Sequence, residues 1–256
     1  MHKKSKVLTI NYFSVFPLFM LFCTVVLGGG NAWAKELQVH VPGGLKIPME
    51  QCARSFSKAH VTVVTGAGPS WMKKAAENAD IIAIGAAHLY SRFTILYPEV
   101  VNTNDWVGLY KRPAGILVRK GNPKNIKGLE DLTAPGLRLL NVACPGQVAS
   151  WEDITGRKNL TEALLKNFAI TVSSGFVGLK KWKEGHGLDA WLTFASWHYT
   201  NSDVTDLVAI PDKDNVFRST LVAVTSLCKK REAAEQFIAF LKSEKAHAIF
   251  QKWGWR

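Results

Sequence analysis

The sequence has little of what most enzyme active sites are built from. Its seven histidines include no HExxH array, no serine lies in a GxSxG motif, and no cysteine lies in a CxxC or Cys/His zinc spacing. The paired acids Glu152 and Asp153 are adjacent, so on a helix they point about 100° apart and cannot hold one substrate atom together. Near a helix start they favour its dipole instead. We therefore expect no catalytic residue, no metal site and no cofactor.

Long hydrophobic runs are absent beyond the N-terminal region. The first six residues include His2, Lys3, Lys4 and Lys6 and no acid. Phe16–Leu27 is apolar except at Pro17 and Thr24, and Ala32-Trp33-Ala34 offers small residues at the positions that a signal peptidase reads. The apolar run is shorter than the roughly 20 residues that a membrane anchor needs. These features predict a cleaved signal peptide over residues 1–34 and a periplasmic protein that is peripheral to the membrane at most.

Acidic residues are scarce, with 20 Asp and Glu against 32 Lys and Arg. Cleavage removes Lys3, Lys4 and Lys6 and no acid, so the formal charge falls only from +12 to +9. Such a field attracts anions. Export and the absence of Lys/Arg blocks argue against nucleic acid.

Cysteines are few as well. After cleavage Cys52, Cys144 and Cys228 remain, so at most one intramolecular disulfide can form. The spacing leaves open which pair bonds, if any.

About 222 mature residues suffice for two small lobes, and the pattern favours two. The first lobe begins with alternating strands and helices, which predicts a βαβαβ unit with parallel strands. The predicted strands are Leu37–Val41, Val61–Thr65 and Ile81–Gly85, and the helices are Ile47–Lys58 and Ser70–Ala79. Ligands lie beyond the carboxyl ends of such strands. The loops there are Pro42–Leu45, Gly66–Ser70 and Gly85–Ala87.

A second α/β lobe follows. Its predicted strands are Leu137–Ala143, Ile170–Ser173 and Asp189–Phe194, and its helices are Ala149–Arg157, Thr161–Phe168 and Phe176–Glu184. A strand at Val216–Thr225 and a helical tail at Glu232–Trp253 complete the chain. We expect strands near 115–119 and 216–222 to cross between the lobes as a hinge. The predicted lobes are 35–116 plus 220–256, and 117–219.

Candidate anion-binding groups lie at the loops and crossings. Gly43 and Gly44 let backbone N–H groups approach a ligand before a helix N-terminus, although the pattern also fits an ordinary turn. The segment Ala143–Ser150 repeats that geometry. Arg112 and Arg218 adjoin the predicted hinge, and a guanidinium matches a carboxylate, phosphate or sulfate. Trp71 follows the second loop and either packs in the core or forms a wall of the pocket.

Several segments together resemble one family along nearly the whole mature chain. They are Pro42-Gly43-Gly44, Lys111-Arg112-Pro113, Val118–Pro123, Trp151-Glu152-Asp153 with Gly156-Arg157, Asp189-Ala190-Trp191 and Ile249–Trp255. This order and spacing are similar to the accessory colonization factor AcfC family. The resemblance implies a type II periplasmic binding protein fold, an α/β fold of two lobes joined by two crossing strands with a ligand cleft between them, as in sulfate- and molybdate-binding proteins. It also implies hinge closure on a small anion.

The family's site residues carry over in part. Positions that match are Gly43, Gly44, Arg112, Gly146, Gln147, Ser174 and Arg218. Positions that depart are Val41, Ala86 and Val148-Ala149, where a glycine, a serine and a Thr-Gly pair are expected. These losses favour a less charged or larger ligand, and Ser150 and Ser173 could compensate. The candidate ligand-binding residues are Gly43, Gly44, Ser70, Trp71, Arg112, Gly146, Gln147, Val148, Ala149, Ser150, Ser173, Ser174 and Arg218.

The sequence therefore predicts a non-enzymatic periplasmic solute-binding protein. It would capture an oxyanion, carboxylate or phosphate-bearing metabolite for an ABC permease or a chemoreceptor. Two alternatives stay open: an adhesin with a vestigial cleft, and an enzyme acting on phosphate or sulfate esters through Cys144 and His88. The sequence is also compatible with a homodimer.

Overall fold

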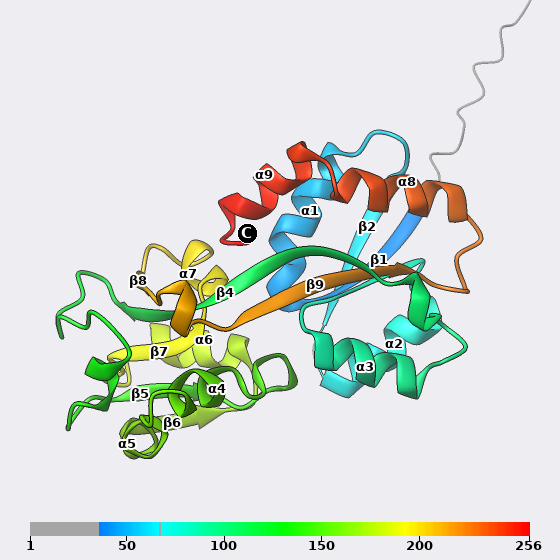
Figure 1. The fold of residues 1–256 in the computed structure, drawn as a ribbon. Coiled ribbons are helices and arrows are strands. Elements are labelled where there is room, and N and C mark those ends of the chain that lie inside the picture. Colours follow the sequence, from blue (N-terminus) through cyan, green and yellow to red (C-terminus); the bar gives the residue numbers. More distant parts are fainter. Residues whose placement is uncertain (1–35, 67) are drawn as a thin grey trace, which may run out of the picture. The chain divides into compact units, whose positions relative to one another are not determined.

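The computed structural model describes residues 36–66 and 68–256, and the predicted signal peptide lies outside them. This part of the chain contains a nine-stranded sheet in the order β2-β1-β3-β9-β4-β7-β5-β6, with β8 paired to β4 (Figure 1). Helices cover both faces of the first half of the sheet, as expected for strands whose side chains are buried on both sides.

The first half starts with the predicted βαβαβ unit. Its elements are β1 (Glu36–Pro42), a 3-10 turn η1 (Gly43–Leu45), α1 (Lys46–Ser55), β2 (His60–Gly66), α2 (Gly68–Asn78) and β3 (Ile81–Ile84). Strand β1 pairs in parallel with both β2 and β3, which confirms the predicted arrangement. The carboxyl ends of all three strands therefore meet at one edge, where Gly43, Gly66 and Gly85 follow them.

Alternating side chains divide this half into two cores. Leu37, Val39 and Val41 of β1 pack with α1, α8 (Arg231–Leu241) and α9 (Glu244–Lys252) on one face. Ile82 and Ile84 of β3 pack with α2 and α3 (Ala87–Leu96) on the other. The sequence did not predict α3. The predicted helical tail is two helices because the Ser243 side chain accepts a hydrogen bond from the Ala246 amide and starts a new one.

The second half of the described chain contains the six predicted strands and helices, one further helix, one further strand and three 3-10 turns. They are η3 (Glu130–Thr133), β5 (Leu139–Val142), η4 (Pro145–Gln147), α4 (Ser150–Gly156), α5 (Thr161–Asn167), β6 (Phe168–Val172), α6 (Gly175–Lys183), β7 (Ala190–Phe194), α7 (Ser196–Tyr199), β8 (Thr205–Ala209) and η5 (Asp212–Asp214). The sequence predicted neither α7 nor β8. Strands β5 and β6 are parallel, as are β5 and β7, so their carboxyl ends also share an edge.

Two long strands connect the halves. In β4 (Val107–Arg119), residues up to Pro113 pair with β9 (Phe217–Val224), and residues from Ala114 pair with β7. The change of partner between neighbouring residues makes β4 a member of both halves. Where each lobe begins and ends, predicted as 35–116 plus 220–256 and 117–219, stays a prediction.

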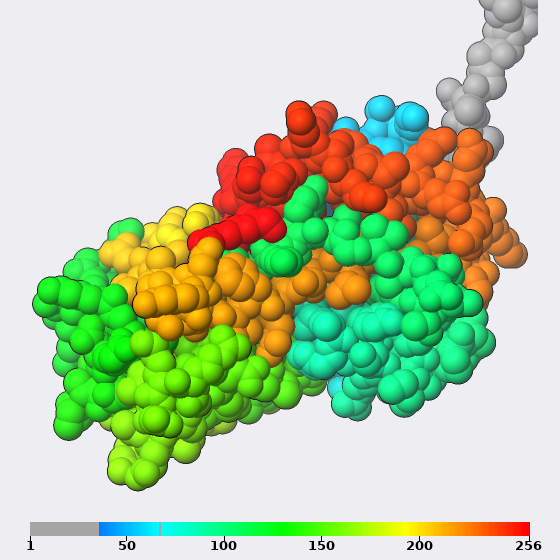
Figure 2. All heavy atoms as spheres, in the orientation of Figure 1, coloured from blue at the N-terminus to red at the C-terminus, as the bar shows by residue number. Residues whose placement is uncertain are grey.

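The C-terminal residues lie against this connection. Lys111 N–H donates to the Arg256 carbonyl at 2.8 Å, and Arg256 N–H donates to the Lys111 carbonyl at 2.7 Å. Figure 2 shows this segment in red beside the orange and yellow residues of the second half. Lys111 precedes Arg112, so the pairing fixes the strand next to the candidate cation.

The predictions about membrane-spanning segments and disulfides can be compared with the described residues. No helix within 36–66 and 68–256 has both the length and the apolar character needed to cross a bilayer. Cys52, Cys144 and Cys228 are all free thiols, with Cys52 buried in the core.

Candidate functional site

A cavity of about 310 Å³ lies where the carboxyl ends of the two sets of parallel strands face each other. From the first half it is lined by Pro42, Gly43, Gly44, Leu45, Gly66, Gly68, Pro69, Trp71, Met72, Gly85, Leu89, Arg92 and Arg112. From the second half it is lined by Cys144, Pro145, Gly146, Gln147, Ser173, Ser174, Gly175, Phe176 and Trp197. Both halves thus contribute strand-end loops, as the parallel topology requires.

Arg112 is the buried cation of this cavity. It lies in β4 and is only 8% exposed. One of its N–H groups donates to the Gly85 carbonyl at 3.3 Å, and its buried Nε–H has no partner among the described residues. Among residues 36–66 and 68–256, no carboxylate forms an ion pair with it. A buried guanidinium without a counter-ion is unfavourable until an anion binds, because desolvation of the charge is then offset by a charge-assisted pair.

The surroundings hold Arg112 in place. Its guanidinium carbon lies 3.9 Å from the ring centroid of Phe194, which gives a cation–π contact. A Cβ added at Gly44 would come within 3.2 Å of Arg112 Nη1. Burial lowers the pKa of Arg112 to about 10, which nearby Cys144 opposes and Arg218 reinforces. The side chain is therefore still charged at neutral pH.

Backbone N–H groups converge near Cys144. Burial raises the pKa of this thiol, while the N–H groups of Gly146, Gln147 and Gly175 and the charge of Arg112 act in the opposite direction. Those groups therefore point toward the thiol and create positive potential beside it. Gly175 begins α6, whose N-terminus carries partial positive charge. This part of the cavity suits a negatively charged group.

Two neutral polar side chains add to these donors. Gln147 is 6% exposed, and in the described part of the chain its side-chain amide has no hydrogen-bond partner. The Ser174 hydroxyl accepts from the Val177 amide as the N-cap of α6, and its O–H can still donate to an anion. Ser173 is exposed at the edge. Gln147 and Ser174 are thus the neutral side chains most available to a ligand.

The rest of the lining is apolar. Trp71 and Met72 of α2 and Leu89 of α3 are buried along one side. On the other side Phe176 and Trp197 meet edge to face, with ring centroids 5.6 Å apart. The cavity therefore joins a cationic, amide-rich end to an aromatic wall.

Two contacts bridge the cavity. His88 of α3 lies with Nε2 2.6 Å from the Pro145 carbonyl of η4, so the ring nitrogen donates to that oxygen. Phe176 of α6 lies so close to Gly43 that a Cβ there would be 2.4 Å from its ring. Each contact joins a strand-end loop or helix of the first half to one of the second. They hold the two sides of the cavity together.

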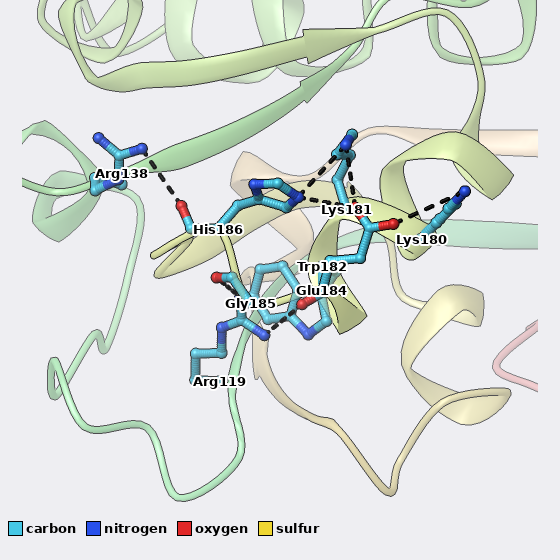
Figure 3. A network of polar contacts seen from close by, with 8 residues as sticks. All are labelled: Arg119, Arg138, Lys180, Lys181, Trp182, Glu184, Gly185 and His186. Atoms are coloured by element: carbon cyan, nitrogen blue, oxygen red, sulfur yellow. Dashed lines mark hydrogen bonds and ion pairs between the residues drawn. The ribbon is translucent and has the colours of Figure 1, made fainter.

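The helix that carries Phe176 is fixed at its other end (Figure 3). Arg119 donates to the carbonyls of Trp182 at 2.8 Å, Gly185 at 2.9 Å and Leu188 at 2.6 Å, and lies over the Trp182 ring. It thereby satisfies carbonyls at the C-terminal end of α6. The same view shows Glu184 between Lys180 and Lys181.

The structure brings together eight of the predicted site residues. Those lining the cavity are Gly43, Gly44, Trp71, Arg112, Gly146, Gln147, Ser173 and Ser174. The other five lie outside the lining: Ser70, Val148, Ala149, Ser150 and Arg218.

The five outlying residues have other surroundings. Ser70 is exposed on α2. Ala149 has a left-handed backbone, with φ of 55°, and the Ser150 hydroxyl donates to the Gln147 carbonyl at 2.7 Å. Arg218 donates to the Val148 carbonyl at 3.0 Å and lies 3.8 Å from an Asp153 carboxylate oxygen. The segment after Gln147 thus turns away from the cavity, and Arg218 is held by it.

Other lining residues lie in the predicted ligand loops without being named as site residues: Pro42, Leu45, Gly66, Gly68, Pro69, Gly85, Cys144 and Pro145. The lining residues outside those loops, which the sequence did not point to, are Met72, Leu89, Arg92, Gly175, Phe176 and Trp197. Arg92 lies four residues after His88 on α3, which puts both on one helix face. That spacing was the available signal, but it needed α3 to be recognised as a helix first.

Metal binding finds no support in the described residues. Within 36–66 and 68–256, no group of three or more His, Cys, Asp or Glu side chains is placed to hold a metal ion. The cavity lining itself includes two arginines and no carboxylate among these residues.

Comparison with protein families gives one result that spans nearly all of the described chain. The profile described as bacterial extracellular solute-binding protein matches residues 37–256. No curated protein matches the sequence significantly.

Solved structures are similar over the same region. PEB3 from Campylobacter jejuni is 29% identical, with a TM-score of 0.76 over 86% of this chain and 99% of that one. SubI, the sulfate-binding protein from Mycobacterium tuberculosis, is 18% identical, with a TM-score of 0.69 over 87% and 86%. The periplasmic molybdate-binding protein of Azotobacter vinelandii is 14% identical, with a TM-score of 0.68 over 86% and 98%. These likenesses confirm the predicted type II periplasmic binding protein fold.

Proposed function

Because the chain belongs to the bacterial extracellular solute-binding protein family, we propose that it captures a small anion between its two lobes and delivers it to a membrane partner. The observation that carries this proposal is Arg112. It is buried, charged and without a carboxylate partner in the described residues, and it faces a cavity built from both halves. A bound anion would supply the missing counter-charge.

Hinge closure would make the capture selective. Donors come from both halves, so the anion gains its full set of contacts only when the two sides are together. We propose lobes of 35–116 plus 220–256 and of 117–219, moving about β4 and the start of β9. The change of strand partners between Pro113 and Ala114 supports a hinge in this part of β4.

The finer assignment follows the relatives. A structure of PEB3 with L-phospholactate, 29% identical to this chain with a TM-score of 0.77 over 86% of this chain and 99% of that one, and the sulfate and molybdate binders above all hold small anions. We propose that this protein is an AcfC-like member that works in the periplasm after removal of residues 1–34. The expected recipient of the bound anion is an ABC permease, and the alternative recipient is a chemoreceptor.

The geometry favours binding over ester hydrolysis. A thiol such as that of Cys144 acts as a catalytic nucleophile when a neighbouring base removes its proton. Burial raises the pKa of Cys144, and the His88 ring nitrogen is bonded to the Pro145 carbonyl. Cys144 and His88 are therefore not arranged as an activated nucleophile–base pair.

The test is a thermal-shift screen of the mature chain with sulfate, phosphate, citrate, phosphoglycerate and a set of organic carboxylates. An anion at about 100 times its Kd adds about 2.7 kcal/mol of stability. We expect at least one anion to stabilise the protein, and Arg112→Met to cut that stabilisation to about half or less. Arg54→Met is the matched control, since Arg54 is exposed on α1 and outside the cavity.

Two results would contradict the proposal. If no anion stabilises the protein, the cleft is vestigial and an adhesin is the better reading. If a phosphate or sulfate ester is turned over, and Cys144→Ala abolishes turnover, the protein is an enzyme.

A further inference from the structure

The cavity carries charge of one sign in the described part of the chain. Its lining includes Arg112 and the exposed Arg92 at the edge, and no Asp, Glu or Lys. An amino acid places an ammonium group next to its carboxylate, and that ammonium would lie near Arg112 with no acid to receive it. Burying an unpaired charge is strongly unfavourable. Zwitterionic ligands are therefore a poor fit.

The cationic end suits one anionic group. Arg112 is the sole guanidinium that is both buried and in the lining among residues 36–66 and 68–256. Its planar fork matches a carboxylate. Arg218 lies outside the lining, donates to the Val148 carbonyl and lies 3.8 Å from Asp153, and its buried Nε–H has no hydrogen-bond partner in the described residues. A second negative charge on the ligand would find no second buried cation in the lining.

The size of the cavity exceeds what an inorganic oxyanion fills. Its volume of about 310 Å³ falls at the lower end of the roughly 300–1,000 Å³ found for organic ligands. Trp71, Met72, Leu89, Phe176 and Trp197 also line the cavity, where Phe176 packs against Gly43 and Trp197 against Gly175. A tetrahedral oxyanion would leave these apolar groups in contact with trapped water or with nothing, which loses dispersion contacts.

Phe176 and Trp197, which meet edge to face, give the apolar part of the lining a defined surface. Phe176 is 55% exposed, although large apolar side chains are usually buried. A flat ring that enters the cavity would cover it, and aromatic pairs add to the gain from burial alone. The exposure of Phe176 thus marks a surface available to a guest.

Resting on the proposed function, we propose that the ligand is an organic carboxylate with one negative charge, no ammonium group and an apolar, preferably aromatic, body. The carboxylate binds Arg112, Gln147 and the strand-end amides. The body lies between the α2 side and the Phe176–Trp197 pair. Inorganic oxyanions bind more weakly because they use only the first of these two regions.

The experiment compares four probes by calorimetry and intrinsic fluorescence on the mature chain. They are phenylacetate, acetate, L-phenylalanine and inorganic sulfate. We expect phenylacetate to bind at least about tenfold more tightly than each of the other probes, because burial of its ring increases the affinity by at least that factor. Binding should change the tryptophan emission, because Trp71 and Trp197 line the cavity.

Variants separate the apolar wall from the anion site. Phe176→Ser should weaken phenylacetate about tenfold more than it weakens acetate, because acetate loses only the contact of Phe176 with Gly43 across the cavity. Leu165→Ser is the control, because Leu165 is 51% exposed on α5 and outside the lining. Exposed positions were chosen so that both variants fold. Equal losses for phenylacetate and acetate in Phe176→Ser would overturn the role of the wall.

The outcomes distinguish this inference from the proposed function. If sulfate or acetate binds as tightly as phenylacetate, and Arg112→Met abolishes that binding, the anion site stands and the ligand class is wrong. If L-phenylalanine binds as tightly as phenylacetate, the argument from the missing acid is wrong. If none of the four probes binds, the ligand class is wrong, and the broader anion screen decides the proposed function.

Discussion

Arg112 and Arg218 are direct cross-strand partners in β4 and β9, so two guanidinium groups start from one face of the sheet. Like charges placed opposite each other are destabilising. The structure separates their roles: Arg218 lies 3.8 Å from Asp153, whereas Arg112 has no acidic partner within the described chain. The pair leaves a net positive charge beside the cavity that a bound anion would reduce.

This arrangement predicts a ranking of two substitutions. Arg112→Met should weaken the anion that binds most tightly in the screen by about 10- to 100-fold, because it removes charge-assisted bonds of about 1.5–3 kcal/mol. Arg218→Met should weaken it only a few-fold, since that side chain contributes through the field alone. Calorimetry at fixed ionic strength measures both. An Arg218 effect equal to the Arg112 effect would place Arg218 in contact with the ligand.

The contact between His88 and the Pro145 carbonyl predicts a change in dissociation rate. His88→Ala removes a hydrogen bond that joins α3 to η4 across the cavity. Such a bond contributes about 0.5–1.5 kcal/mol, so we expect the ligand to leave a few-fold to about tenfold faster. Stopped-flow tryptophan fluorescence measures this rate. His60→Ala on β2 is the control, because His60 is exposed and outside the lining. An unchanged dissociation rate for His88→Ala would mean that the contact does not hold the cavity closed.

The Arg119 clamp predicts a loss of stability from a conservative change. Arg119→Lys keeps the charge but cannot reach three carbonyls at once or stack on Trp182 in the same way. We expect the free energy of unfolding to fall by about 2 kcal/mol, measured by urea denaturation. Arg138→Lys is the comparison, since Arg138 makes a single 3.4 Å contact with the His186 carbonyl. Equal losses of unfolding free energy in the two variants would show that the three Arg119 bonds stabilise the fold no more than the single Arg138 contact does.

His40 predicts how stability depends on pH. This side chain is 3% exposed, and neither ring nitrogen has a hydrogen-bond partner in the part of the chain that the structure describes. Burial lowers its pKa, which Asp80 partly opposes. The unfolded chain therefore binds a proton near pH 6.5 that the folded chain does not. Stability from this residue is complete above that pH and falls by about 1.4 kcal/mol per unit below it, until the lower folded pKa is reached.

The corresponding experiment compares urea denaturation of the parent and of His40→Leu between pH 7.5 and 5. The variant should lose less stability on acidification. Since the substitution also changes packing, the informative quantity is the slope with pH and not the absolute value. Parallel slopes would show that another group is responsible for acid sensitivity.

The sequence was sufficient for the parts of the fold that local patterns determine. Alternating β-branched strands and amphipathic helices gave the βαβαβ unit, because burial on both faces demands apolar strands. The position of Arg112 followed from its place just before the predicted crossing strand. By contrast, α3 was missed because Ala87–Leu96 mixes aromatic, β-branched and polar residues that are weak helix formers.

The composition of the cavity wall was harder to predict for a physical reason. Phe176 and Trp197 come from different elements and meet only when α6 and α7 pack in the second half. Their sequence context fits ordinary core residues equally well. The segment from Val148 to Ser150 was expected to face the ligand, but the left-handed backbone at Ala149 redirects it. Such a conformation in a residue with a side chain is uncommon and has no clear local signal.

The thiol of Cys144 gives the site a built-in chemical reporter. Because burial raises its pKa, alkylation should be slow at neutral pH and accelerate in mildly alkaline solution. An occupied cavity would shield the sulfur from the reagent, and Cys52, whose pKa burial raises to about 12, should stay unmodified throughout. Mass spectrometry of labelled peptides could then follow occupancy in whole-cell extracts, without engineering a fluorophore into the protein.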